Sequence, residues 1–178
     1  MIKFGIFLTV LLCLSLVSCS KSIIKPAGEP TGSAPNIEEA KKIASTDVVR
    51  AAASPTDITA GGLGKVDVHL LVQPGYHINA NPPTYSYLKA TELEIAPSEG
   101  ISVGPISYPK PLDKKFPFAE KPLAVYEGET ELKAILKADG SAAKGERSVS
   151  ARLRIQACDD QVCYPPGTLN LTIPVTIK

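Results

Sequence analysis

An all-β domain, an antiparallel β-sandwich of about seven or eight strands, is the fold that the sequence predicts for residues 47–178. Two observations lead to this prediction. Apolar and polar residues alternate in several short segments, which is the pattern of strands buried on one face. Glycine and proline residues separate these segments, and no segment between them has the period of a helix, so sheets are expected to pack on sheets.

Four segments carry the alternation most clearly, and two more strands are expected at 91–95 and 101–108. Pro174 has no N–H to donate and falls on the outward side of the last segment, so that strand is expected at a sheet edge or with a bulge. The predicted inward-facing sets are Val66, Val68, Leu70 and Val72; Leu132, Ala134 and Leu136; Val149, Ala151, Leu153, Ile155 and Ala157; and Leu169, Leu171, Ile173, Val175 and Ile177.

Residues 1–18 have the pattern of an export signal. Lys3 precedes an apolar run from Ile6 to Val17, which is too short for the ~20 residues that span a bilayer. The end of the run, Leu-Val-Ser-Cys19, resembles the lipobox of bacterial lipoproteins, in which cleavage leaves a lipid-modified cysteine as the new N-terminus. Cys19 is therefore expected to carry acyl chains that anchor the protein to a membrane, and ordinary secretory cleavage nearby is the alternative.

Residues 19–46 are expected to connect this lipidated cysteine to the domain as a flexible tether. The segment is rich in proline and glycine and has no sustained apolar period. A flexible coil of this length has a root-mean-square reach of roughly 30 Å, which is enough to hold a domain clear of a membrane surface.

Cys158 and Cys163 are the two cysteines left for redox chemistry. Of the four in the chain, Cys13 leaves with the signal and Cys19 is consumed by the lipid. The remaining pair suits a hairpin that places the two Cα atoms ~4.4 to 6.8 Å apart, the separation that a disulfide requires. An exported compartment permits the bond. A ring of about six residues stabilises the fold by only roughly 2 kcal/mol, so a redox role is favoured over a staple.

The segment around these cysteines, Gln-Ala-Cys-Asp-Asp-Gln-Val-Cys-Tyr-Pro-Pro, resembles the active-site segment of the N-terminal periplasmic domain of DsbD, the transmembrane thiol-disulfide interchange protein. Fainter similarity covers residues 75–83 and 115–128. The resemblance implies an immunoglobulin-like sandwich with its cysteines at one end, acting as a thiol-disulfide oxidoreductase. This chain has one residue fewer between its cysteines than the best-known DsbD domain, so neither the loop shape nor the reduction potential is carried over.

The resemblance also implies the partners. The chain reaches Lys178 without the membrane-embedded and thioredoxin-like domains of full-length DsbD. A separate membrane thiol reductase is therefore expected as electron donor, and oxidised periplasmic thioredoxin-like or cytochrome-maturation proteins as acceptors. The expected location is the periplasmic face of a bacterial membrane, through the lipid anchor at Cys19.

Cys163 is expected to engage partners and Cys158 to resolve the mixed disulfide. Asp159 adjoins Cys158 and disfavours a thiolate there, whereas Cys163 is farther from the acidic pair and precedes Tyr164 at a rigid Tyr-Pro-Pro corner. The resemblance implies the same roles for the two cysteines. Tyr164 is a candidate for support of the active site.

Two further regions are candidates for the site. The resemblance implies a cap loop whose aromatic ring covers the disulfide, and Phe116 and Phe118 fall in the corresponding region. Phe118 is favoured as the covering ring; the alternative is that one or both rings fill the end of the core. His77 could assist proton transfer, because its unperturbed pKa of about 6.5 lies near working pH, or it could be an ordinary surface or half-buried side chain. Asn79, on the same strand face, is expected to shape the loop.

Three functions compete for this sequence. A redox carrier is favoured over an immunoglobulin-like binding or structural module with a non-exchanging disulfide. Metal handling would use Cys158, Cys163 and His77 for a soft ion such as Cu(I), but the adjacent acidic residues and the lack of a Met or His cluster weigh against it. No metal and no cofactor are expected. A formal net charge of +1 offers no basic face, so no nucleic-acid partner is expected either.

Overall fold

Twelve strands and one short 3₁₀ turn make up residues 43–178, the part of the chain that the computed structural model describes. The predicted export signal, the lipid site at Cys19 and the tether up to residue 42 lie outside the described residues. Ser45 and Thr46, predicted as the end of the tether, lie instead in the 3₁₀ turn that begins the domain, and Ser45 is buried. Residues 43–178 contain no helix that is long and apolar enough to cross a membrane. The fold is an immunoglobulin-like β-sandwich, as the sequence predicts.

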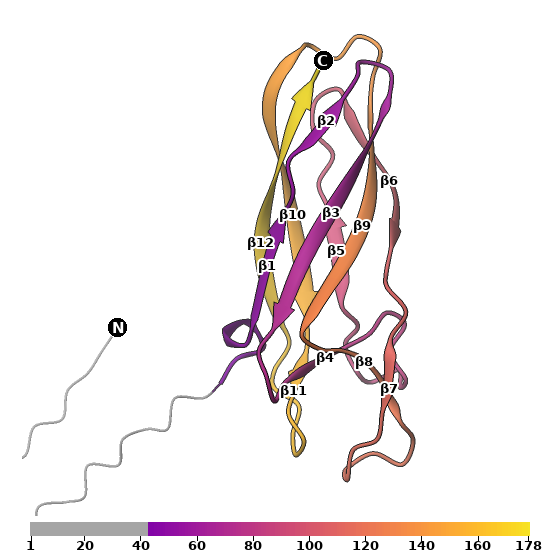
Figure 1. The fold of residues 1–178 in the computed structure, drawn as a ribbon, viewed down its shortest axis with the longest axis vertical. Helices are drawn as coiled ribbons and strands as arrows, with labels where there is room; N and C mark the ends of the chain where they lie inside the picture. Colours follow the sequence, from indigo (N-terminus) through magenta and orange to yellow (C-terminus); the bar gives the residue numbers. More distant parts are fainter. Residues whose placement is uncertain (1–42) are drawn as a thin grey trace, which may run out of the picture. The chain divides into compact units, whose positions relative to one another are not determined.

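Two four-stranded sheets form the sandwich (Figure 1). The first sheet is antiparallel throughout, and in the second only β2 runs parallel to its neighbour. The first has the order β1 (Val49–Ala53), β3 (Leu63–Val72), β9 (Glu129–Ala138) and β6 (Ile101–Ser107). The second has the order β2 (Thr56–Ile58), β12 (Gly167–Ile177), β10 (Gly145–Ile155) and β5 (Glu92–Ile95).

The alternating segments bury their apolar sides between these sheets, as expected for strands with one face on the core. Every predicted inward residue of β3, β9 and β10 is buried. In β12 only Ile173, Val175 and Ile177 are buried, whereas Leu169 and Leu171 are half-buried and pack against the edge of the core. The prediction of the inward faces is therefore confirmed, except at the start of the last strand.

Pro174 lies where β12 changes from one neighbour to two. It pairs in register with Ser148 of β10, and β2 joins the other side of β12 only from Val175 onward. Because a proline cannot donate to a second neighbour, it fits at the last position before β2 begins. The expectation of an edge is thus right up to Pro174 and wrong for residues 175–177.

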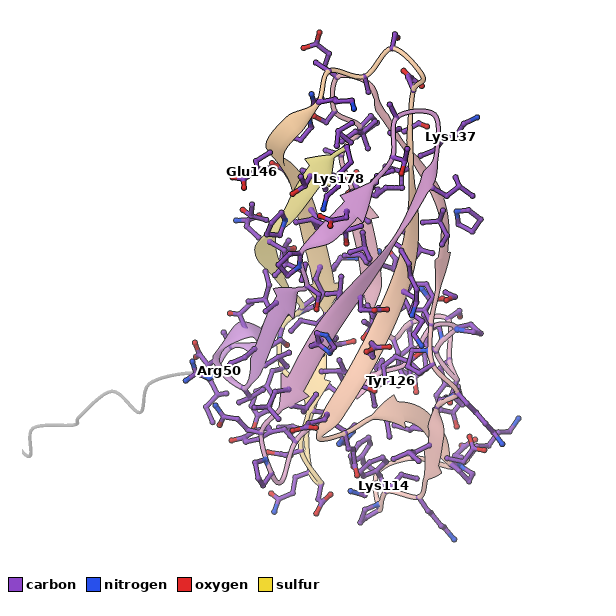
Figure 2. All side chains as sticks on the ribbon, turned by 45° about the horizontal axis from the view of Figure 1, so that its top comes forward. Arg50, Lys114, Tyr126, Lys137, Glu146 and Lys178 are labelled. Carbon is purple, nitrogen blue, oxygen red and sulfur yellow. A yellow bond between two sulfur atoms is a disulfide. The ribbon has the colours of Figure 1, made fainter. Side chains whose placement is uncertain are left out.

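A third sheet covers one end of the sandwich, and its neighbouring strands all pair antiparallel. Its strands have two to four residues each, too few to show an alternating pattern, which is why the sequence predicted seven or eight strands rather than twelve. Figure 2 shows Lys114 near this end and Lys137 and Lys178 toward the other. The sheet has the order β11 (Ala157–Cys158), β4 (His77–Asn79), β8 (Leu123–Tyr126) and β7 (Leu112–Lys114).

Candidate functional site

The Cys158–Cys163 disulfide closes a tight hairpin that continues from β11. The Tyr164 N–H donates to the Ala157 carbonyl (2.8 Å), and the Asp159 N–H donates to the Val162 carbonyl (2.9 Å). The two cysteines face each other between these bonds as a non-hydrogen-bonded pair, the kind whose Cα atoms lie closest. Their Cα atoms are 3.9 Å apart, closer than the range expected from the sequence.

The two sulfurs differ in access. Cys158 is fully buried, whereas Cys163 is half-buried and lines a groove of about 300 Å³. The other walls of the groove include three apolar side chains with unusually large exposed fractions: Tyr87 (71%), Val162 (52%) and Phe118 (45%). A thiol that approaches through this groove reaches Cys163 and not Cys158.

Asp159 and Tyr164 fix the shape of the hairpin. The Asp159 carboxylate accepts the backbone N–H groups of Gln161 (2.7 Å) and Val162 (2.8 Å) on one oxygen and the Tyr164 hydroxyl (2.5 Å) on the other. The hydrogen bond from Tyr164, followed by those from the two amides, lowers the pKa of Asp159. The same bond raises the pKa of Tyr164 to about 12. The charge of Asp159 is thus engaged by donors of its own hairpin.

His77 lies beside the buried cysteine. In the register of β4 and β11, His77 is the cross-strand partner of Cys158, and its side chain is only 1% exposed. Its ring stacks on Phe116 at 4.1 Å between centroids, and Nε2 has no hydrogen-bond partner among residues 43–178. Burial lowers the pKa of His77, and the charge of Glu127 opposes this only in part. The imidazole is therefore neutral at pH 7. The other two residues of β4 are buried as well, so this strand does not alternate between a buried and an exposed face.

The two aromatic rings of the loop after β7 differ in their surroundings. Phe116 is 2% exposed and packs with Leu123 and Val125 in a small apolar cluster. Phe118 stacks on Phe116 at 5.4 Å between centroids, but lies half in solvent and lines the groove with Cys163. Phe116 thus fills the interior at this end of the domain, and Phe118 is the ring beside the accessible sulfur.

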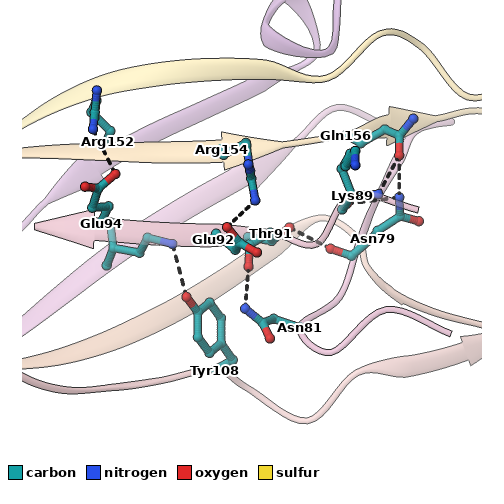
Figure 3. A network of polar contacts seen from close by, with 11 residues as sticks. Asn79, Asn81, Lys89, Thr91, Glu92, Glu94, Tyr108, Arg152, Arg154 and Gln156 are labelled. Carbon is teal, nitrogen blue, oxygen red and sulfur yellow. Dashed lines mark hydrogen bonds and ion pairs between the residues drawn. The ribbon is translucent and has the colours of Figure 1, made fainter. Parts of the chain in front are cut away.

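A polar network around Gln156 joins the hairpin to the rest of the third sheet. Figure 3 shows the part of it that connects Gln156, Asn79 and Lys89. The side-chain oxygen Oε1 of Gln156 accepts hydrogen bonds from the Asn79 side-chain amide (3.1 Å) and the Lys89 N–H (2.9 Å). The Gln156 amide donates to the Tyr164 carbonyl (3.2 Å), and the Asn79 amide also donates to the Lys89 carbonyl (3.2 Å). The alternating pattern predicts no role for Gln156, because it falls on the outward side of the strand. Its place two residues before Cys158 is the one feature of the sequence that could have indicated a role in the site.

Residues 43–178 contain no group of three or more His, Cys, Asp or Glu side chains placed to hold a metal ion. Both cysteines of the Cu(I) ligand set considered above are joined in the disulfide, so neither is a thiolate ligand. The metal-handling alternative therefore gains no support from this part of the chain.

Comparisons with known proteins give a family and a fold. The sequence model of the family described as "Thiol:disulfide interchange protein DsbD, N-terminal" matches residues 47–173. The N-terminal periplasmic domain of ScsB from Proteus mirabilis is 18% identical with a TM-score of 0.52, over 71% of this chain and 46% of that chain. The DsbD N-terminal domain of Neisseria meningitidis in the reduced form is 20% identical with a TM-score of 0.48, over 74% and 87% of the two chains. A comparison with curated proteins gives no match.

Proposed function

Because this chain belongs to the family of DsbD N-terminal domains, we propose that it is an exported thiol-disulfide interchange protein that passes reducing equivalents through Cys158 and Cys163. The electrons come from a separate membrane thiol reductase and go to oxidised periplasmic proteins, of the thioredoxin-like or cytochrome-maturation kind. One observation carries the proposal: the disulfide joins the fully buried Cys158 to Cys163, which is half-buried and lines a mostly apolar groove. That asymmetry is what a two-step exchange requires.

Reduction begins at the exposed sulfur. A thiolate of the donor attacks Sγ of Cys163, the disulfide breaks, and the electron pair leaves on Sγ of Cys158, which takes up a proton. The second thiol of the donor then loses its proton and attacks the donor sulfur that is bonded to Cys163, which releases Cys163 as a thiolate. The donor loses two electrons and becomes a disulfide, and the Cys158 and Cys163 pair becomes a dithiol.

Delivery runs through the same atoms in reverse order. The Cys163 thiolate attacks the disulfide of the acceptor, one acceptor sulfur leaves as a thiolate and is protonated, and a mixed disulfide forms. Cys158 loses its proton and attacks Sγ of Cys163, which re-forms the internal bond and releases the second acceptor sulfur. Access supports these roles, since a partner can approach Cys163 from the groove whereas Cys158 is fully buried.

The neighbouring side chains take supporting roles in this proposal. Phe118, which lines the groove with Cys163, shields that sulfur until a partner displaces the ring, and Tyr164 holds the hairpin through Asp159. Asn79 shapes the loop around Lys89. His77, neutral and with an unpartnered nitrogen next to Cys158 in the register, accepts the proton that Cys158 must lose before it attacks.

The location in the proposal depends on Cys19. Acylation there holds the domain at the periplasmic face of a membrane, through the tether that precedes Ser45, within reach of a reductase in the same compartment. Export also supplies the oxidising environment in which the disulfide persists.

Trapping a mixed disulfide with a partner tests this function. Cys158→Ser removes the resolving thiol, so a complex through Cys163 should accumulate and dissolve on addition of dithiothreitol. Cys163→Ser is the matched control and should form none. The reverse result would overturn the assignment of roles. Absence of a trapped complex with either variant would favour the structural module with a non-exchanging disulfide.

A further inference from the structure

Ser45 touches both arms of the cysteine hairpin from a distant part of the chain. It lies in the 3₁₀ turn η1 (Ser45–Asp47), where the described chain enters the domain, and is fully buried. Its hydroxyl accepts the N–H of Ala157 (2.9 Å), the residue before Cys158. The same hydroxyl donates to the carbonyl of Pro165 (2.6 Å), two residues after Cys163. One side chain thus bridges the two arms at the base of the hairpin.

The turn that carries Ser45 is itself fixed to the sandwich. Asp47 closes the turn, because its carboxylate accepts the Ala44 N–H (3.0 Å) and its own N–H donates to the Ala44 carbonyl (2.9 Å). The next residue, Val48, is buried in the core, and its carbonyl accepts the N–H of Gln73 (2.9 Å). Ser45 is therefore held by the body of the domain and not by the hairpin.

Close packing between the turn and the second arm of the hairpin also indicates that the two are held together. A Cβ atom on Gly167, the first residue of β12, would lie 2.6 Å from Cγ2 of Thr46, so only a glycine lets the turn sit this near the strand. Hydrogen bonds within the hairpin cannot fix its position relative to the rest of the domain. Those to Ser45 can, because they connect the hairpin to the turn. Loss of the hydroxyl would leave the N–H of Ala157, a fully buried residue, without a partner.

We propose that Ser45 is a positioning residue for the Cys158–Cys163 pair, which keeps the two arms in register when the disulfide is open. Held in this way, the Cys158 thiol stays opposite Cys163, and the attack that re-forms the ring loses little chain entropy. Without the hydroxyl the arms separate more freely in the dithiol, so ring closure becomes less favourable and the oxidised form is easier to reduce. The inference rests on the proposed exchange function.

The redox equilibrium of the full chain tests this inference. The protein is purified from membranes in detergent, equilibrated with mixtures of oxidised and reduced dithiothreitol, alkylated and digested with trypsin. Residues 155–178 are released as one peptide that carries both cysteines and no other lysine or arginine than its last residue, so its mass counts the free thiols. For Ser45→Ala the ratio of disulfide to dithiol should fall about tenfold, which is a shift of ~30 mV for two electrons.

Thr56→Val is the matched control. Thr56 is also a buried hydroxyl residue that donates to a backbone carbonyl (Lys65, 3.0 Å), but it lies in β2, away from the third sheet (Figure 1). Its redox ratio should equal that of the wild type. An unchanged ratio in Ser45→Ala, or an equal shift in Thr56→Val, overturns the inference. A wild-type disulfide that does not react refutes the exchange function itself, which is a different outcome.

A measurement on the wild type keeps the inference testable if Ser45→Ala does not fold. Because the Ala157 N–H donates to Ser45, its hydrogen exchange should be slow in the disulfide and in the dithiol form alike. Exchange of this amide at the rate of an open chain after reduction would show that the turn releases the hairpin, and would overturn the role of Ser45.

Discussion

Phe118→Ala should expose the disulfide to small thiols. The Phe118 ring is 45% exposed, so about half of the 1.5–3 kcal/mol gained on fully burying a phenylalanine holds it in the groove, roughly 0.8–1.5 kcal/mol. If the ring must leave before a thiol reaches Cys163, its removal lowers the barrier by that amount and speeds reduction ~4- to 12-fold. The rate is measured with glutathione, which has no docking surface for this groove, by following free thiols with time.

Stability separates this reading from a core role for the ring. Phe118→Ala should lower the free energy of unfolding by the same roughly 0.8–1.5 kcal/mol, measured by urea denaturation. Phe116→Ala, at a ring only 2% exposed, should cost about 3–5 kcal/mol. A Phe118→Ala protein that loses as much stability as Phe116→Ala, or that is reduced no faster than the wild type, would refute the reasoning.

Three further predictions concern Asp159, His77 and Cys19. Asp159→Ala should bring the pKa of Tyr164 from about 12 back toward 10, because the acceptor of its hydroxyl is lost; an unchanged tyrosine absorbance titration would contradict the Tyr164–Asp159 hydrogen bond. His77, whose pKa is lowered by burial, binds fewer protons than in the unfolded chain, so the free energy of unfolding should fall as pH drops below ~6.5 and level off below the lowered pKa. The chain has only one other histidine, His69, so NMR can assign the titration of the His77 ring; an ordinary pKa for His77 would contradict its burial. Cys19→Ala should release the protein from the membrane fraction, and a mature mass without lipid in the wild type would refute the anchor.

The sequence predicted those parts of the fold that repeat a pattern. Residues such as Val66, Leu132 and Leu153 alternate over long strands, and burial on one side follows from strand geometry. Short strands carry no such repeat. His77 looked like a residue on one face of an alternating strand, yet the third sheet is covered on both sides at β4, and burial there depends on segments distant in sequence, such as Phe116.

The site was predictable only where its residues are adjacent in sequence. Cys158 and Cys163 pair across a hairpin, so local spacing was sufficient to predict the bond. Ser45 lies 112 residues before Ala157, and nothing in a polar segment that looked like the end of a tether distinguishes it. Phe116 and Phe118 have the same residue type two positions apart, and only tertiary packing separates a buried ring from one in the groove.

The reduction potential of the Cys158–Cys163 bond separates an exchanging disulfide from a structural one. Thiol-exchange proteins lie roughly between −270 and −120 mV, whereas structural disulfides of secreted proteins typically lie below about −300 mV. The value follows from equilibrating the folded wild-type chain with defined glutathione or dithiothreitol mixtures and counting free thiols on the peptide of residues 155–178. The account predicts a potential within the exchanging range. A value well below about −300 mV, or a bond that does not react while the protein is folded, would contradict it.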